Sequence, residues 1–149
     1  MKKNYLQVWI MCPSTQHKME FLLFEQRDSE ESKPYWGPWE TEVPDLLLTA
    51  SEIPLLLENK NNFTLIEPTL IPFKKNYEKE NPAQTTKEVF LVYGIKLSSK
   101  EHLITKIDPK QINTMEWVPL IQVLDYLHKE YHSIVFFDWY KAIKLNKLP

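Results

Sequence analysis

The alternation of apolar and polar positions indicates two strands near the start of the chain. Residues 5–12 alternate at first and end at Pro13, which predicts one strand. Residues 19–27 have a fully apolar middle, which predicts a second strand that is buried on both faces of a sheet. A short polar turn separates the two runs, so we expect the strands to form a hairpin.

The rest of the chain divides into runs with strand or helix patterns and polar segments between them. Strands are predicted over 64–74, 87–97 and 115–118. Helices are predicted over 52–59, along an apolar stripe in 120–129, and from His132 or Ser133 onward. Loops are predicted over 76–86 and 98–113, and an aromatic cluster around a Gly-Pro turn over 35–39.

One of these helices contains a proline near its start. With Ser51 as the N-cap, Pro54 falls in the first turn, where a proline costs the helix no hydrogen bond. A short helix over 52–59 is therefore predicted in place of a longer one that begins near Asp45.

The order of predicted elements is β-β-α-β-β-β-α-α. The hairpin strands exclude a simple βαβ array, so a mixed sheet with helices on both faces is the best fit. We therefore predict an α/β (α+β) sandwich. The chain has 149 residues, close to the commonest size of a domain, and we expect residues 1–149 to form one domain.

Charge and hydropathy limit the classes of partner. The 18 basic and 20 acidic residues give a net charge of -2, so there is no long-range field to recruit nucleic acid or an anionic membrane. No apolar run approaches the roughly 18 residues that a membrane span requires, and the first residues lack a secretory signal pattern. We expect a cytoplasmic protein that binds neither nucleic acid nor membrane.

Scarce residue types exclude several chemistries. Cys12 is the single cysteine, so an internal disulfide is excluded, and its place after an apolar run predicts a buried, unreactive thiol. Gly37 and Gly94 are the two glycines. Loops that cradle phosphate need several glycines, so a P-loop and a dinucleotide-binding turn are both excluded.

Two local signatures, together with the order of elements, resemble the Nudix family. The first is the apolar strand that ends at Arg27, followed by Trp36-Gly37-Pro38. The second is Glu116-Trp117-Val118-Pro119-Leu120, which runs into an apolar helix. The resemblance spans nearly the whole chain and implies a Nudix-like α/β/α sandwich.

The catalytic motif of that family, G-x5-E-x7-R-E-U-x-E-E-x-G-U with U an apolar residue, fits poorly. Aligned without gaps from Gly37, the motif is matched at Glu52 and Ile53. Leu55 and Leu56 occupy the positions of the glutamate pair that holds Mg²⁺, and leucine has no oxygen to offer a metal. The resemblance therefore implies a Nudix-like domain whose metal-binding box is degenerate.

Carboxylates elsewhere offer an alternative to the lost pair. If the chain is active, Glu52 and Glu58 are the catalytic and metal-binding candidates, and Mg²⁺ is needed only in that case. Glu88 and Glu116 are further candidates beside a ligand, because some Nudix enzymes use a glutamate outside the box. A rearranged carboxylate site and an ordinary solvated face are both open for the acidic residues at 40, 42, 45, 52 and 58.

Aromatic residues are the second group of candidates. Trp36 and Trp39 are able to stack on a flat ligand or to cap the core. His128 and His132 are four residues apart, but we expect a break between two helices to separate them, so a zinc site is not predicted. The aromatic residues at 35–39 and 136–140 exceed what a core of this size needs, which favours a homodimer or a protein partner.

Two functions remain open. The first is a binding domain for a nucleotide-like ligand or a protein partner, without the usual magnesium-dependent hydrolysis. The second is a divergent Nudix hydrolase that cleaves a nucleoside diphosphate linked to another moiety. The missing glutamate pair favours the first, because a replacement site must place several carboxylates in near-octahedral geometry around Mg²⁺.

Overall fold

The computed structural model describes most of the chain. The described residues are 2–14, 19–27, 31, 33–45, 47–49, 51–61, 63–81, 86–105 and 114–144. Among them, no helix has the length and apolar character needed to cross a membrane.

Most of the strands belong to one mixed sheet. Its seven strands are β1 (Lys2–Cys12), β2 (Glu20–Gln26), β3 (Tyr35–Gly37), β4 (Trp39–Val43), β6 (Thr69–Asn81), β7 (Thr86–Lys96) and β9 (Thr114–Pro119). β1 pairs in parallel with β7, and every other pairing is antiparallel. A separate pair joins β5 (Phe63–Leu65) to β8 (Leu103–Thr105).

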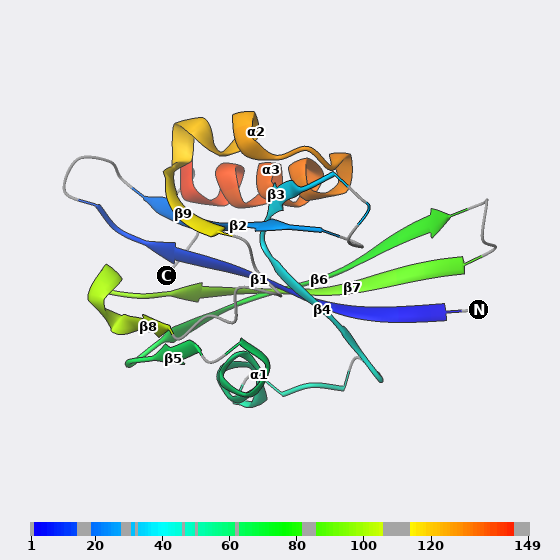
Figure 1. Cartoon of the computed structure of the whole chain (residues 1–149), viewed down its shortest axis with the longest axis horizontal. Coiled ribbons are helices and arrows are strands. Elements are labelled where there is room, and N and C mark those ends of the chain that lie inside the picture. Colours follow the sequence, from blue (N-terminus) through cyan, green and yellow to red (C-terminus); the bar gives the residue numbers. More distant parts are fainter. Residues whose placement is uncertain are drawn as a thin grey trace.

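Helices cover both faces of this sheet, as the order of elements predicts. α1 (Glu52–Asn61) lies against one face, and α2 (Val123–Tyr126) with α3 (Glu130–Lys144) lies against the other (Figure 1). Two short 3-10 turns, η1 (Lys100–His102) and η2 (Leu120–Gln122), precede β8 and α2. The predicted α/β sandwich with a mixed sheet is confirmed.

Alternation along the strands sends side chains to two separate cores. In β1, Leu6, Val8 and Ile10 face α1, while Trp9 and Met11 face α3. β2 divides in the same way, so its apolar middle is buried on both faces, as predicted. Cys12 is buried too, and this burial raises the pKa of its thiol, which fits the expected unreactive thiol.

The first two strands form a fork. β1 and β2 pair over Ile10↔Leu22 to Cys12↔Glu20, which confirms the predicted hairpin, and they then separate. β3 continues the pairing along β2, and β4 continues it along β1. The segment 35–43 therefore crosses from one arm of the fork to the other at Gly37-Pro38.

Both glycines of the sequence lie under rings of α3. A Cβ built on Gly94 would lie 2.5 Å from Cη2 of Trp139, and a Cβ on Gly37 would lie 2.7 Å from two ring atoms of His132. Neither glycine has a positive φ, so it is close packing and not backbone conformation that requires them. Glycine at these two points allows α3 to approach the sheet closely.

The structure corrects the predictions over 35–39 and 76–86. The aromatic cluster contains two short strands, β3 and β4, which are recognisable only through their pairing with β2 and β1. The predicted polar loop 76–86 is shorter, because β6 runs to Asn81 and β7 starts at Thr86, while 82–85 lie outside the described residues. β6 is the last strand in the order of the sheet and pairs with β7.

Smaller corrections concern the last third of the chain. Within the predicted loop 98–113, η1 and β8 occupy 100–105, and 106–113 lie outside the described residues. The apolar stripe of 120–129 is a 3-10 turn followed by the single turn of α2. α3 begins at Glu130, two or three residues before the predicted start at His132 or Ser133.

Candidate functional site

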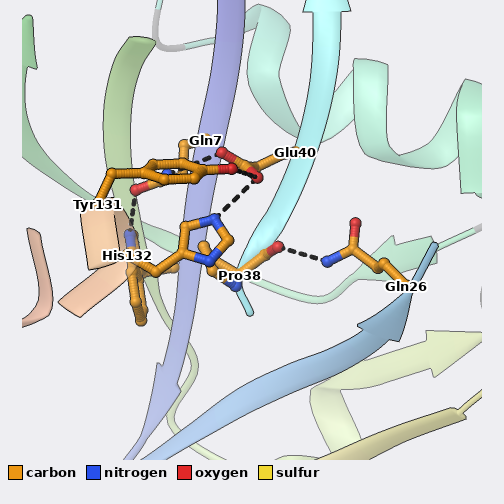
Figure 2. Close-up of polar contacts among 7 residues, drawn as sticks. Gln7, Gln26, Pro38, Glu40, Tyr131 and His132 are labelled. Atoms are coloured by element: carbon orange, nitrogen blue, oxygen red, sulfur yellow. Dashed lines mark hydrogen bonds and ion pairs between the residues drawn. The ribbon is translucent and has the colours of Figure 1, made fainter. Parts of the chain in front are cut away.

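A buried carboxylate joins three elements under the amino end of α3. Glu40 lies on β4, its side chain is 9% exposed, and it accepts three hydrogen bonds (Figure 2). His132 Nε2 lies 2.9 Å and Tyr131 Oη 3.1 Å from Oε1, and Gln7 Nε2 lies 2.9 Å from Oε2. The carboxylate thus connects β4 with β1 and with the first turn of α3.

The position of Gln7 follows from strand pairing. Gln7 on β1 and Glu40 on β4 are direct cross-strand partners, so their side chains point to the same face of the sheet. Trp9 Nε1 donates to Oε1 of Gln7 at 2.7 Å, which fixes the orientation of the amide. The amide nitrogen of Gln7 therefore faces Glu40 as a donor.

His132 is held between Glu40 and Gly37. Its side chain is 0% exposed, and its ring lies 4.2 Å from that of Tyr131, centroid to centroid. Among the described residues, none forms a hydrogen bond with Nδ1 of His132. Within that part of the chain, the ring is therefore held by the hydrogen bond from Nε2 to Glu40.

Burial and neighbouring groups have opposite effects on Glu40. Burial is the largest single influence and acts to raise the pKa of the carboxyl. The charge of His132 and the hydrogen bonds from His132, Gln7 and Tyr131 act together in the other direction, and the pKa of Glu40 lies below its ordinary value. Glu40 is therefore ionised at neutral pH and accepts all three hydrogen bonds.

This network is suited to holding α3 on the sheet. Both carboxylate oxygens are engaged by donors from the chain itself, and the histidine ring is closed off from solvent. From the sequence, a rearranged carboxylate site and a solvated face are both open for Glu40, and His132 is predicted only to start a helix and not to bind zinc; neither interpretation predicts their contact. In the sequence, Gly37 and Glu40 lie three residues apart, but nothing in the sequence shows that both contact His132. That contact depends on the position of α3 in the fold.

The candidate catalytic residues lie on the opposite face of the sheet. Glu52 and Glu58 are exposed on α1, at its first residue and in its middle. Leu55 is 58% exposed, whereas Leu56 packs partly against the core beneath α1. Glu52 and Glu58 are six residues apart on the helix, so they point in different directions.

The residues near α1 do not fit a magnesium site. Mg²⁺ requires several oxygen donors at near-octahedral positions. In the described part of the chain, no three His, Cys, Asp or Glu side chains come together in a group that could hold a metal ion.

Two of the predicted ligand-binding residues meet around a third side chain. Trp36 on β3 is partly buried, and its ring meets that of Tyr126 edge to face at 5.5 Å. Tyr126 Oη donates to Oε1 of Glu116 at 3.2 Å, and Glu116 is exposed on β9. Partial burial and the Glu116 carboxylate raise the pKa of Tyr126, so its hydroxyl is a donor at neutral pH.

The other two predicted ligand-binding residues are separate from this group. Trp39 is 2% exposed and belongs to the core that faces α1, so its ring offers no open face for stacking, and the core-capping alternative fits better. Glu88 lies near the start of β7, where its backbone pairs with Lys3 of β1 and Lys79 of β6. The structure therefore brings Trp36 and Glu116 together and leaves Trp39 and Glu88 apart from them.

Comparison of the structure with solved structures finds similar proteins, whereas comparison of the whole sequence does not. No family model matches the sequence, and no curated protein matches it. Solved structures match over most of their length. The NUDIX domain of NrtR from Shewanella oneidensis, complexed with ADP ribose, has 14% identity and a TM-score of 0.68, with 96% of this chain and 89% of that chain covered.

Two further structures show the same fold. A NUDIX hydrolase from Nitrosomonas europaea has 8% identity and a TM-score of 0.65, with coverage of 95% and 90%. The C-terminal domain of mouse MUTYH, in complex with human PCNA, has 12% identity and a TM-score of 0.67, with coverage of 97% and 91%. The chain therefore has the Nudix fold, as the resemblance in the sequence predicts.

Proposed function

We propose that this chain is a Nudix-fold binding domain that holds a nucleotide-like ligand or a protein partner and does not perform magnesium-dependent hydrolysis. The observation that carries the proposal is the surface of α1. This helix presents an exposed Leu55 at a position where the Nudix motif requires a metal-binding glutamate. A leucine side chain there is unable to bind Mg²⁺ or to orient a phosphate.

The buried carboxylate does not replace the missing pair. Glu40 already accepts three hydrogen bonds and lies beside His132, so a metal ion would have to displace these donors. It is also nearly closed off from solvent, with a side chain that is 9% exposed. Glu40 therefore has a structural role in this proposal.

Trp36, Tyr126 and Glu116 are the residues we assign to a nucleotide-like ligand. The partly buried Trp36 ring offers a surface for a flat base, and stacking of this kind is worth about 1–3 kcal/mol per base. The exposed Glu116 carboxylate can accept hydrogen bonds from amino or hydroxyl groups. A complex with ADP ribose is known for one structure of the same fold, which supports this class of ligand.

A protein partner is the other arm of the proposal. The C-terminal domain of MUTYH shares the fold and is found in complex with another protein. Exposed apolar side chains are present on this chain as well, among them Leu55 and Phe137. Such side chains at a surface are typical of contacts with other macromolecules.

Calorimetry with a parallel assay for the two phosphate monoesters that cleavage of the pyrophosphate bond would release, AMP and ribose 5-phosphate in the case of ADP ribose, tests the proposal. The protein is titrated with ADP ribose and a nucleotide panel, each with Mg²⁺, with Mn²⁺ and with a chelator. Binding that is independent of metal, without turnover, is the expected result, and Trp36→Ala should weaken it roughly tenfold or more, consistent with the loss of one stacked base. Glu101→Gln, at an exposed site on η1, is the matched surface control.

The same assay tests the alternative, a divergent hydrolase. Its motive is Glu52, which matches the motif and is exposed at the first turn of α1. Metal-dependent formation of the two phosphate monoesters that is lost in both Glu52→Gln and Glu58→Gln would overturn the proposal in favour of the alternative. If neither a nucleotide nor turnover is detected, the protein-partner arm remains, and immobilised domain then serves to test candidate partners.

A further inference from the structure

We infer that α3 is the contact helix of a symmetric homodimer, in which two copies of this helix pack antiparallel. The inference concerns the outer face of α3, which is separate from the residues assigned to a ligand. Four side chains of this helix are exposed among those described, and they are Glu130, Ile134, Phe137 and Lys141. We call these four the α3 stripe.

The spacing of the α3 stripe is that of a helix–helix seam. The steps between its members are four, three and four residues. At 100° per residue, the four positions fall within about 60° around the helix axis. Apolar positions that alternate by three and four residues are typical of helices that pack along one another.

The stripe points away from the sheet. Tyr131, His132, Val135, Phe136 and Trp139 are the buried residues of α3, and they lie on the opposite side of the helix. Ile134 is 42% exposed and Phe137 is 48% exposed, although both are large and apolar. Nothing within the described chain covers them, and two adjacent apolar side chains on one helix face favour a partner helix.

Charge complementarity identifies the partner as a second copy. The stripe begins with an acid, Glu130, and ends with a base, Lys141, with the apolar pair between them. When a second α3 lies antiparallel across a two-fold axis between residues 135 and 136, Glu130 lies opposite the second copy's Lys141. Ile134 then lies opposite the second copy's Phe137, and symmetry forms each of these contacts twice.

A parallel pair of α3 helices would be less stable than the antiparallel pair. In a parallel pair of copies, Glu130 meets Glu130 and Lys141 meets Lys141, and like charges oppose association. The antiparallel pair is the one that satisfies both ends of the stripe with the residues of this chain. Ile121 on η2 and Leu124 on α2 are also exposed and apolar, and α2 lies on the same face of the sheet as α3 (Figure 1).

Charge reversal tests the arrangement directly. The mass of the wild-type protein is measured by sedimentation over a concentration series, and it should rise to twice the mass of one chain. Glu130→Lys and Lys141→Glu each convert both end contacts from attractive to repulsive, so each should raise the dissociation constant roughly tenfold. An equimolar mixture of the two variants restores both attractive contacts, and it should form a heterodimer.

Two further variants keep the test independent of folding. Phe137→Ser removes apolar area from the middle of the stripe and should also weaken the dimer. Leu55→Ser removes an exposed leucine from α1 on the other face of the sheet, and it should leave the dimer unchanged. Thermal unfolding of each variant confirms that the fold is retained.

Several outcomes would overturn the inference. A wild-type protein that stays monomeric over the whole series excludes the dimer. A dimer that tolerates both charge reversals, or two folded variants that fail to associate when mixed, excludes the antiparallel pairing. Weakening by Leu55→Ser to the same extent as by Phe137→Ser would place the interface elsewhere.

Discussion

The two helical layers of this molecule are attached to the sheet in different ways. α3 is held by specific contacts. Glu40 accepts hydrogen bonds from Tyr131 and His132 of this helix and from Gln7 of β1. The rings of His132 and Trp139 pack directly on Gly37 and Gly94. α1 is attached by apolar packing, with Ile53 and Leu57 fully buried in the core on its side.

Acidic residues show the same difference. On the α3 side, a carboxylate is buried and paired, and its removal or misplacement would leave polar groups unsatisfied. On the α1 side, Glu52 and Glu58 are exposed to solvent. We infer that the hydrogen bonds to Glu40 fix the position of α3 on the sheet. Among the described residues, the exposed side chains of α1 make no such contacts, so we expect α1 to tolerate substitutions on its outer surface.

The largest expected effect is at His132. His132→Ala should lower the free energy of unfolding by about 2–5 kcal/mol, because it removes a hydrogen-bond donor from the buried Glu40 carboxylate and leaves a cavity above Gly37. Urea denaturation measures the loss. Glu58→Ala, which removes an exposed side chain from α1, should change stability by less than about 0.5 kcal/mol.

The pairing itself is tested by a double-mutant cycle with Glu40→Gln and His132→Ala. If the two residues act through each other, the double variant loses less than the sum of the single losses. Additive losses, or a cost at His132 no larger than at Glu58, would show that α3 is held by general packing, as α1 is.

The second effect concerns Gly94 and Trp139. Gly94→Ala should cost about 1–3 kcal/mol, because the added methyl group meets the buried ring of Trp139 and forces it to move. In a Trp139→Phe background the smaller ring leaves room for the methyl group, so the added cost of Gly94→Ala should fall. Chemical denaturation of the four proteins measures both values.

A control on the other layer sharpens this prediction. Thr64→Ala lies at an exposed position of β5, which packs with α1, and it should change stability by less than about 0.5 kcal/mol. An equal cost of Gly94→Ala with Trp or Phe at position 139 would mean that the close approach of α3 is not what requires the glycine.

The sequence predicted the elements whose pattern is local. β1, β2 and β7 have apolar runs that are set by burial on one or both faces, and their predicted extents agree with the structure within a few residues, apart from the first residues of β1. β3 and β4 were missed because they have three and five residues, and their identity as strands depends on pairing with distant arms of the fork.

For the candidate site too, local features could be predicted from the sequence and contacts between distant residues could not. The poor match of residues 51–58 to the Nudix motif is visible in the sequence, because a motif is a local pattern. The pairing of Glu40 with His132 joins residues 92 positions apart, and no spacing rule connects them. Gly37 was noted as part of a turn, whereas its role in admitting the His132 ring depends on the position of α3.

The third effect is the pH dependence of stability. The folded-state pKa of Glu40 lies below its ordinary value, so the unfolded chain binds a proton on this group more readily than the folded protein does. The contribution of Glu40 is therefore fully present above its unfolded pKa, and it is lost as the pH falls through the lower folded pKa.

Glu40→Gln isolates this contribution. The wild-type protein should be more stable than the variant near pH 7, and the difference should shrink below about pH 4, where unfolded carboxyls become protonated. This effect is smaller than the loss at His132, because the amide of glutamine keeps part of the hydrogen bonding. Urea denaturation at a series of pH values measures it, and a constant difference would contradict an ionised Glu40.

The smallest expected effect concerns metal ions and α1. A ligand that binds the folded protein stabilises it, by about 2.7 kcal/mol at 100 times its dissociation constant. Because the residues on α1 do not fit a magnesium site, millimolar Mg²⁺ or an added chelator should move the unfolding temperature by less than about 1 °C. A rise of several degrees with Mg²⁺ that disappears in Glu52→Gln would show that α1 does hold a metal, and α1 would then be the more precisely organised layer of the two.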